Sequence, residues 1–196
     1  MTLTNNQKIY IYGGSFNPPT IAHQAIAEAC LAQPECKELW IMPSGERTDK
    51  SMGVDVNHRM NLLNEFIGSF SCNKSVQIET LEIEREGLTQ THVTVELLQD
   101  KYPDKEFRYI FGSDSYNTMH TWTDGLKLKE NLDILIIPRD GEVVKDAPNI
   151  KILKKDIPGG ISSTGVKDSL NAGKDISQFV SSGVERYIRR FKLYVQ

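Results

Sequence analysis

IYIYGGSFNPPTIAH, residues 9–23, is the stretch that decides the fold of this 196-residue chain. The apolar and aromatic residues 9–12 predict a buried strand. Two glycines, a phenylalanine and two prolines follow and predict a tight turn, because glycine adopts unusual dihedral angles and proline ends regular structure. A helical pattern of apolar residues then starts at once, and we expect a helix over residues 24–32 with His23 at its start. A strand, a short turn and a helix in this order are typical of α/β proteins.

The alternation of strands and helices continues along the chain. Apolar residues recur with the period of a strand in some segments and of a helix in others. We expect strands at residues 8–12, 38–42, 76–83, 107–111, 133–137 and 150–153, and helices at 24–32, 57–70, 91–101, within 115–131, after Ser162 and near 184–194. This order predicts a doubly wound α/β fold, with a mostly parallel, Rossmann-like sheet and helices on both faces. We expect one domain over residues 1–196, with a small helical C-terminal part at about 161–196.

The composition is that of an ordinary globular protein. Hydrophobic residues make up 39%, charged residues 25%, and the net charge is −3, so we expect neither disorder nor a strong field for nucleic acid. The chain shows no long apolar run and no leader pattern, so we expect a cytoplasmic protein without a membrane partner. Its three cysteines lack C-x-x-C spacing, and we expect neither a disulfide framework nor a protein-bound metal.

A parallel sheet predicts where a ligand binds. Ligands lie beyond the carboxyl ends of the strands, so the candidate segments are residues 13–23, 43–50, 84–91, 112–114 and 138–141. Backbone N–H groups around Gly13 and Gly14, close to a helix start, suit phosphate oxygens. The spacing is neither the dinucleotide fingerprint nor the P-loop. Taken alone, the glycine pair is also compatible with a purely structural turn, and His23 is also compatible with a helix cap. At this point both structural alternatives to a phosphate site stay open.

Two separated motifs resemble one nucleotidyltransferase superfamily. Residues 13–23 are similar to its G-[ST]-F-[DN]-P and [HT]-x-x-H pattern, and residues 161–167, ISSTGVK, are similar to its I-S-S-T-x-I-R. Two motifs in the right order are more specific than either one. Further segments resemble the nicotinate- and nicotinamide-mononucleotide adenylyltransferases over nearly the whole chain, namely FGSD at 111–114, Trp122, residues 43–50, Arg59, Thr89-Gln90-Thr91 and IPRDG at 137–141.

The resemblance implies a reaction and a set of site residues. In this family the 5′-phosphate of a pyridine mononucleotide attacks the α-phosphorus of ATP and pyrophosphate leaves. The nucleophile is already an anion, so the protein has to position it and neutralise charge. The implied catalytic residues are His23, Thr20 and Lys167. The implied ATP-binding residues are Gly13, Gly14, Ser15, Phe16, Gly112, Asp114, Ile161, Ser162, Ser163 and Thr164, and the implied substrate-binding residues are Asn17, Lys50, Thr89, Thr91, Trp122 and Arg139.

The resemblance also implies the cofactor and partners. Mg²⁺ would accompany ATP, held by phosphates and waters with few protein ligands. ATP and a pyridine mononucleotide are the implied partners, and a homo-oligomer is compatible with the sequence. Lys167 stands where the family usually has arginine. It keeps the positive charge but cannot donate two parallel hydrogen bonds to one phosphate as arginine does. Gly165 weakens the first turn of the expected helix.

Two alternatives stay open. One, within the same superfamily, is nucleotidyl transfer to another phosphate acceptor, such as phosphopantetheine or glycerol phosphate. The other is a protein that senses a nucleotide without turning it over, which the departures at Thr20, Gly165 and Lys167 motivate. The choice between nicotinate and nicotinamide depends on whether residues 87–91 present N–H groups or a carbonyl. We expect nicotinate, because the spacing from the G-x-D segment to Trp122 and the R-x-G at 139–141 resemble bacterial enzymes. G-S-F-N-P with T-x-x-H also resembles enzymes that accept the amide, so nicotinamide stays an alternative.

Overall fold

A computed structural model of the protein describes residues 7–45, 52–71, 73–85, 87–139, 141–145, 147–155 and 157–195. Two compact units make up the chain. Unit 1 consists of Met1–Gly14, Ala29–Glu46 and Lys74–Lys155, and unit 2 of Ser15–Glu28, Arg47–Asn73 and Asp156–Gln196. The expectation of a single domain over residues 1–196 stays a prediction.

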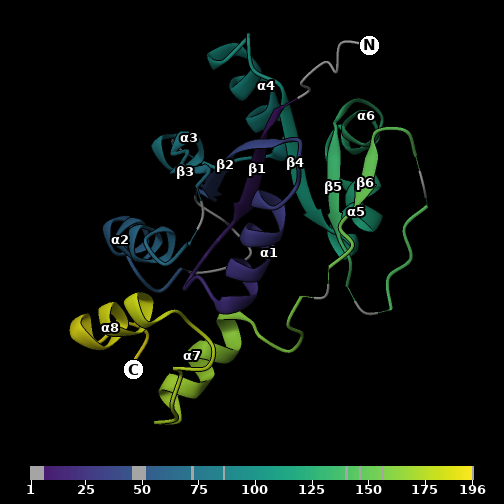
Figure 1. The fold of residues 1–196 in the computed structure, drawn as a ribbon. Coiled ribbons are helices and arrows are strands. Elements are labelled where there is room, and N and C mark those ends of the chain that lie inside the picture. The colour runs from purple at the N-terminus through teal and green to yellow at the C-terminus, as the bar shows by residue number, and fades with distance from the viewer. Residues whose placement is uncertain are drawn as a thin grey trace. The chain divides into compact units, whose positions relative to one another are not determined.

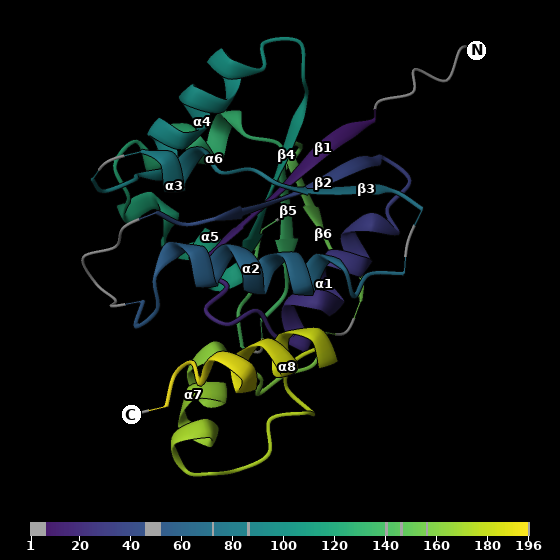
Figure 2. The ribbon, with the colours of Figure 1, turned by 90° about the vertical axis from the view of Figure 1, so that its left-hand side faces the viewer.

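Unit 1 contains a parallel sheet (Figure 1). Within the described residues its strands are β1 (Lys8–Gly14), β2 (Cys36–Pro43), β3 (Ser75–Ile78), β4 (Phe107–Gly112), β5 (Ile134–Ile137) and β6 (Ile150–Ile152), in the order β3-β2-β1-β4-β5-β6. Every neighbouring pair is parallel, and Figure 2 shows the twist between successive strands. From β1 the chain adds β2 and β3 on one side of the sheet, and it then adds β4, β5 and β6 on the other side. The point of reversal therefore lies between β1 and β4, where Tyr12 pairs with Ile110. This is the strand order of a doubly wound fold, so the expected fold class is confirmed.

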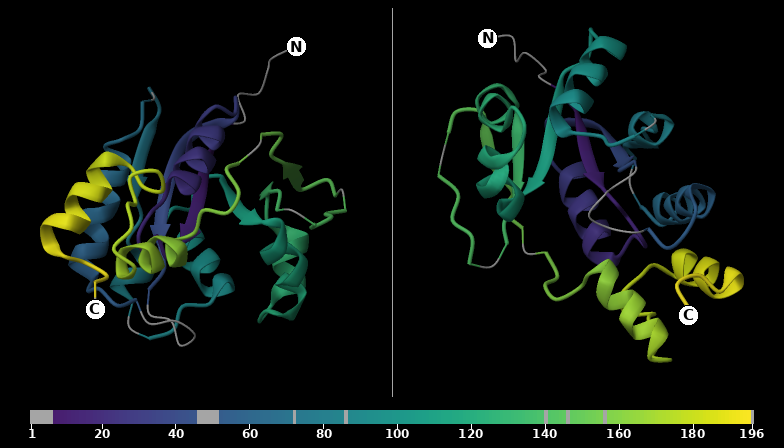
Figure 3. Two further views of the ribbon diagram at one scale, coloured as in Figure 1. Left: turned by 90° about the horizontal axis from the view of Figure 1, so that it is seen from below. Right: turned by 180° about the vertical axis from the view of Figure 1, so that it is seen from behind.

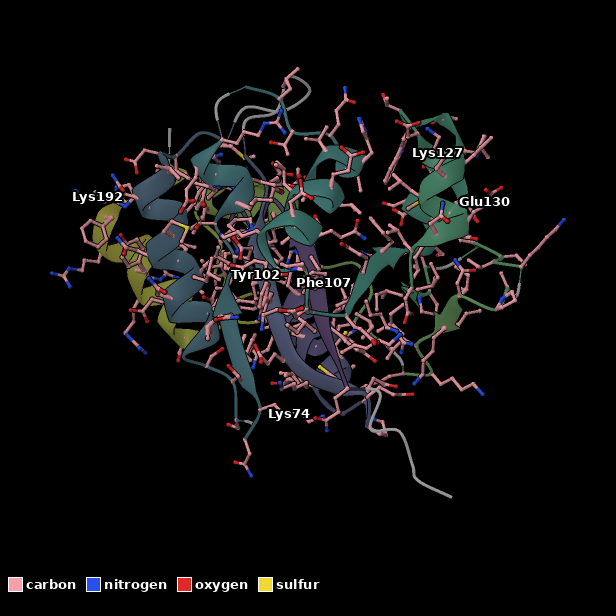
Figure 4. The ribbon with its side chains drawn as sticks, turned by 90° about the horizontal axis from the view of Figure 1, so that it is seen from above. Lys74, Tyr102, Phe107, Lys127, Glu130 and Lys192 are labelled. Carbon is pink, nitrogen blue, oxygen red and sulfur yellow. The ribbon has the colours of Figure 1, made fainter. Side chains whose placement is uncertain are left out.

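One hydrophobic core cluster of unit 1 lies on one face of this sheet. Alternate strand residues face helix α4 (Thr91–Lys101), the short helix η1 (Met119–Thr121) and helix α6 (Gly125–Asn131). Tyr102, next to α4, packs its ring 6.4 Å from Phe107 of β4, as can be followed in Figure 4. The buried cluster consists of Ile9, Ile11, Trp40, Met42, Val95, Leu98, Phe107, Tyr109, Met119, Leu128, Leu132, Ile134 and Ile136.

A network of charged side chains joins the amino ends of β1, β4 and β5. Arg108 donates two hydrogen bonds to the Asp133 carboxylate, of 2.6 and 3.0 Å, and Lys8 donates a third. Arg108 also donates to the hydroxyl of Tyr10 at 3.0 Å. Burial of Asp133 disfavours its charged form, but the hydrogen bonds from Arg108 and Lys8 outweigh this and hold the pKa of its carboxyl below the usual value. The network therefore stabilises the fold at neutral pH.

We expect Asp133→Asn to destabilise the protein by about 2 kcal/mol at pH 7, because the three charge-assisted hydrogen bonds from Arg108 and Lys8 are weakened or lost. A group with a lowered pKa contributes its full stability above its ordinary pKa and loses it as the pH falls through the folded value. The difference in unfolding free energy between Asp133→Asn and the original protein should thus shrink below about pH 4. Urea unfolding at several pH values measures it. A constant difference down to pH 2 would contradict the assignment.

Two differences from the expected elements have local causes in unit 1. The strand expected at 76–83 ends at Ile78, because the buried carboxylate of Glu79 accepts the N–H of Leu81 at 3.1 Å and the chain turns into the short helix α3 (Leu81–Glu84). The helical region expected within 115–131 is divided into α5 (Ser113–Thr118), η1 and α6. It breaks at Asp124, which has φ 54°, and at Gly125, where a Cβ would collide with the carbonyl of Met119.

Unit 2 is helical in the described residues. Its elements are α2 (Val56–Ile67), α7 (Ser163–Asn171), α8 (Ser182–Phe191) and most of α1 (Ile21–Leu31), whose last residues, from Ala29, belong to unit 1. α1 starts three residues earlier than expected, so His23 lies in its first turn. α8 packs beside α2 (Figure 3). A Cβ at Gly183 would lie 2.6 Å from a carboxylate oxygen of Glu65. None of the helices traced in the described ranges is long and apolar enough to span a membrane.

Candidate functional site

The loop that follows β1 belongs to unit 2 and turns at Phe16. This residue has φ 43° and is 1% exposed, with its ring 5.2 Å from the ring of His23 and 6.4 Å from that of Phe66. Left-handed backbone costs a non-glycine residue about 1–2 kcal/mol, so it persists only where packing determines it. The turn expected at Gly13 and Gly14 is thus made by a phenylalanine, and both glycines continue strand β1.

Three side chains from separate elements of unit 2 hold this loop by its acceptor groups. Arg59 of α2 donates to the carbonyl of Ser15 at 3.3 Å. Ser163, the first residue of α7, donates to the carbonyl of Pro18 at 2.8 Å. Tyr194, beyond α8, donates to Oδ1 of Asn17 at 2.5 Å. Since Ser163 belongs to the second sequence motif, both motifs meet on one loop.

Thr20 and His23 form a reciprocal cap at the start of α1. Nδ1 of His23 accepts the backbone N–H of Thr20 at 3.0 Å, while Oγ1 of Thr20 accepts the backbone N–H of His23 at 3.4 Å. This is a capping box in which an imidazole replaces the usual glutamate. A backbone N–H can only donate, so Nδ1 is unprotonated and the neutral ring carries its proton on Nε2. The hydroxyl of Thr20 lies 2.7 Å from Nδ1 and the residue is 1% exposed, which makes Thr20 a support for His23.

Two cationic groups of unit 2 contact this loop or its support, Arg59 the loop and Lys167 the ring of Tyr194. Arg59 is 5% exposed, and burial lowers the pKa of its guanidinium. Lys167, on the second turn of α7, places its ammonium 5.4 Å from the centre of the Tyr194 ring. Ser162 caps α7 by accepting the N–H of Gly165 at 3.0 Å, and Thr164 is exposed beside it, while Ile161 is half-buried. An imidazole N–H, two cations and a helix start form a set that binds anions.

In unit 1 a second group of expected site residues gathers at the carboxyl ends of β4 and β5. A Cβ at Gly112 would collide with the carboxylate of Asp114 in its present position and lie 3.4 Å from Nε of Arg139, so the three residues lie close together. The buried hydroxyl of Ser113 accepts the backbone N–H of Arg139 at 2.8 Å. Asp114 is exposed, and its carboxylate can accept two hydroxyl groups of a ligand.

The start of α4 forms a further part of the site in unit 1. Thr91 is the first residue of this helix, and Gln90 before it makes no side-chain cap. Oγ1 of Thr89 is buried and has no hydrogen-bond partner among the described residues. A Cβ at Gly45 would lie 3.1 Å from this hydroxyl. Trp122 is half-buried, with its ring 6.0 Å from that of Phe111. A buried hydroxyl and uncapped N–H groups are donors that an acidic ligand could use.

Of the remaining expected site residues, Lys50 lies outside the described part of the chain and Asn17 lies within the phosphate loop. Asn17 is 2% exposed, and its amide nitrogen donates to the carbonyl of Met52 while its oxygen accepts from Tyr194. Tyr194 had no signal in the sequence, because no pattern separates it from the other residues after the last helix. No group of three or more His, Cys, Asp or Glu side chains suited to a metal ion occurs in the part of the chain that the structure describes.

Comparisons with known proteins find relatives over nearly the whole chain. The chain is 29% identical over 192 residues to a protein of Bacillus licheniformis, covering 96% of this chain and 98% of that protein. It is also 29% identical over 199 residues to a protein of Lactiplantibacillus plantarum, covering 100% of this chain and 92% of that protein. Both relatives carry the name "Probable nicotinate-nucleotide adenylyltransferase".

Solved structures share the fold. Two structures of the Plasmodium falciparum nicotinic acid mononucleotide adenylyltransferase, complexed with NaAD and with APC, match with TM-scores of 0.84 and 0.83. Their identity to this chain is 24% and 23%, and each match covers 96% of this chain and 97% of the other. A family model described as cytidylyltransferase-like matches residues 11–169, which include both motifs. The expected enzyme class, a nucleotidyltransferase, is confirmed, and the chain belongs to the cytidylyltransferase-like family.

Proposed function

We propose that the protein transfers the adenylyl group of ATP to nicotinate mononucleotide and releases pyrophosphate, a step of NAD biosynthesis. One observation carries the proposal: the Thr20–His23 capping box and the Ser163 end of α7 meet on the loop from Ser15 to Pro18. A phosphate oxygen of the mononucleotide attacks the α-phosphorus, a new O–P bond forms, and the bond to the β-phosphate oxygen breaks. The electron pair leaves with pyrophosphate, and no general base is needed.

The residues of unit 2 would neutralise charge in this reaction. Nε2–H of His23 would donate to the α-phosphoryl group, where negative charge increases in the transition state. Lys167 and the N–H groups at the start of α7, with Ser162, Ser163 and Thr164, would bind the β- and γ-phosphates. Ser15 and Phe16, together with Gly13 and Gly14, would line the phosphate path.

The residues of unit 1 would bind the remaining parts of the substrates. Gly112 and Asp114 would hold the adenosine ribose, and Trp122 would stack on the pyridine ring. Lys50, Thr89, Thr91 and Arg139 would contact the mononucleotide. Mg²⁺ would accompany ATP and neutralise the leaving pyrophosphate. The phosphates would be its main ligands, since the loop in unit 2 offers N–H donors and cations in place of carboxylates.

We propose nicotinate as the preferred substrate because the start of α4 offers donors. A carboxylate is stabilised by N–H groups at a helix start and by the Thr89 hydroxyl, whereas an amide would also need an acceptor for its NH₂ group. We expect kcat/KM for nicotinate mononucleotide to exceed that for nicotinamide mononucleotide about 10- to 100-fold. Thr89→Val should lower this ratio, and Thr118→Val, an exposed hydroxyl of unit 1, should leave it unchanged.

The measurement is pyrophosphate release with ATP and each mononucleotide. A ratio in favour of nicotinamide would contradict the assignment of the α4 start. No release with either mononucleotide would reject the proposed function and favour another phosphate acceptor.

A further inference from the structure

The segment after α8 returns to the phosphate loop within unit 2. Lys192 and Tyr194 both have left-handed backbone, with φ 50° and 66°, and neither is glycine. Leu193 between them is buried and donates its N–H to the carbonyl of Ile188 at 3.0 Å. The left-handed Lys192 is the C-cap of α8, and backbone hydrogen bonds to Ile188 and Arg189 hold it. Tyr194 lies beyond this cap, where left-handed backbone persists only if tertiary contacts hold it, and its side chain makes such contacts.

The hydroxyl of Tyr194 fixes the side chain of Asn17. Because the amide nitrogen of Asn17 donates to the carbonyl of Met52, its oxygen faces Tyr194, and the phenol is the donor. Burial raises the pKa of the Tyr194 phenol above its usual value, so the proton stays in place at neutral pH. Asn17 follows Phe16, the residue at which the loop turns. Its position therefore contributes to the path of the loop, together with the packing of Phe16.

The ring of Tyr194 lies against Lys167. The ammonium of this lysine is 5.4 Å from the ring centre, which is within the range of a cation–π interaction. A lysine side chain has four flexible bonds and lacks the planar guanidinium group of arginine, so a contact with a ring helps to hold its ammonium group in one place. One tyrosine thus contacts both the loop of the first motif and the cation of the second.

We infer that Tyr194 is a positioning residue of the anion site, holding Asn17 and Lys167 in place without touching a substrate. This inference rests on the proposed function and changes the role expected for Asn17, which becomes part of the loop's support. Tyr194→Phe removes the hydroxyl and keeps the ring, and Tyr194→Leu removes both. Tyr187→Phe is the matched control, since its hydroxyl also lies within hydrogen-bonding distance of side chains of unit 2, those of His58 and Asn61, but not of the loop.

We expect Tyr194→Phe to lower kcat/KM for ATP about 5- to 10-fold and Tyr194→Leu about 30-fold. The KM for the mononucleotide should change by less than about twofold, because Asn17 would then not contact it. In a Lys167→Met background the loss caused by Tyr194→Leu should shrink, since part of it acts through the lysine. Tyr187→Phe should retain the original kcat/KM.

Unchanged kcat/KM in Tyr194→Leu, an equal loss in Tyr187→Phe, or full additivity with Lys167→Met would each overturn the inference. The dissociation constant for ATP, measured by calorimetry without turnover, gives a second measure of the same effects. If the original protein bound ATP but released no pyrophosphate, the proposed function would fail, and the Tyr194 variants would still be compared by their ATP affinity.

Discussion

His23→Ala is expected to lower kcat for adenylyl transfer about 10²- to 10³-fold, the usual loss when one preorganised donor to a transition-state oxyanion is removed. The reason is the fixed tautomer: Nδ1 accepts the backbone N–H of Thr20, so Nε2 carries the proton that the α-phosphoryl oxygen would accept. KM should change less than kcat, because the charge on this oxygen increases only as the bond to pyrophosphate breaks. Steady-state pyrophosphate release measures both constants.

His23→Gln is the control for stability. Glutamine at the third helical position completes a capping box, so this variant should melt close to the original protein and yet remain about as inactive as His23→Ala. Thr20→Val, which removes the hydroxyl beside Nδ1, should lower kcat about 10-fold, and Thr20→Ser should restore it. Activity of His23→Gln near the original level would mean that Nε2–H has no role in the reaction.

Lys167→Met is expected to lower kcat/KM for ATP about 10²-fold, because it removes a positive charge from the phosphate site and keeps a side chain of similar length. Lys167→Arg should retain most of the activity, since the charge persists and a fork is added. The exposed Lys174, just beyond α7, offers the matched control. Lys174→Met should keep the original kcat/KM.

A second comparison separates charge from packing. If Lys167 acts through its charge, raising the salt concentration should weaken ATP binding to the original protein more than to Lys167→Met. Equal salt dependence in both proteins, or loss of activity in Lys167→Arg, would show that the lysine has a different role. Melting temperatures of all three variants should stay close together, because Lys167 is only half-buried.

Much of the fold could be predicted from periodicity. The helix at residues 91–101 begins and ends as expected, and each of the six segments expected to be strands overlaps a strand. Short apolar segments do not distinguish a strand from a helix as clearly. Leu81 and Ile83 alternate as in a strand, but the side chain of Glu79 bonds back to the chain and starts a turn. Such a side-chain contact depends on burial, which a local pattern does not contain.

The two motifs of the site could be found because each is continuous in sequence. Their supports were only partly accessible: Arg59 stands out through the family resemblance, but its contact with Ser15 does not, and Tyr194 reaches the loop from a distant part of the chain without any sequence signal. The turn was expected at the glycine pair, since glycine is the usual left-handed residue. Packing of the Phe16 ring against Phe66 places the turn at Phe16 instead, and this tertiary effect overrides the local preference.

The charged network of Lys8, Arg108 and Asp133 lies far from the expected binding residues at the carboxyl end of β4, and this separation affects how the protein can evolve. Arg108 and Gly112 belong to the same strand, and four residues of extended chain separate them by about 13 Å. Effects at sites this far apart are usually additive. Substitutions around Asp133 can thus raise or lower the thermal stability of the protein, while substrate preference evolves independently at the carboxyl ends of the strands. Adaptation to a higher temperature would then require no change in the residues that bind the substrates.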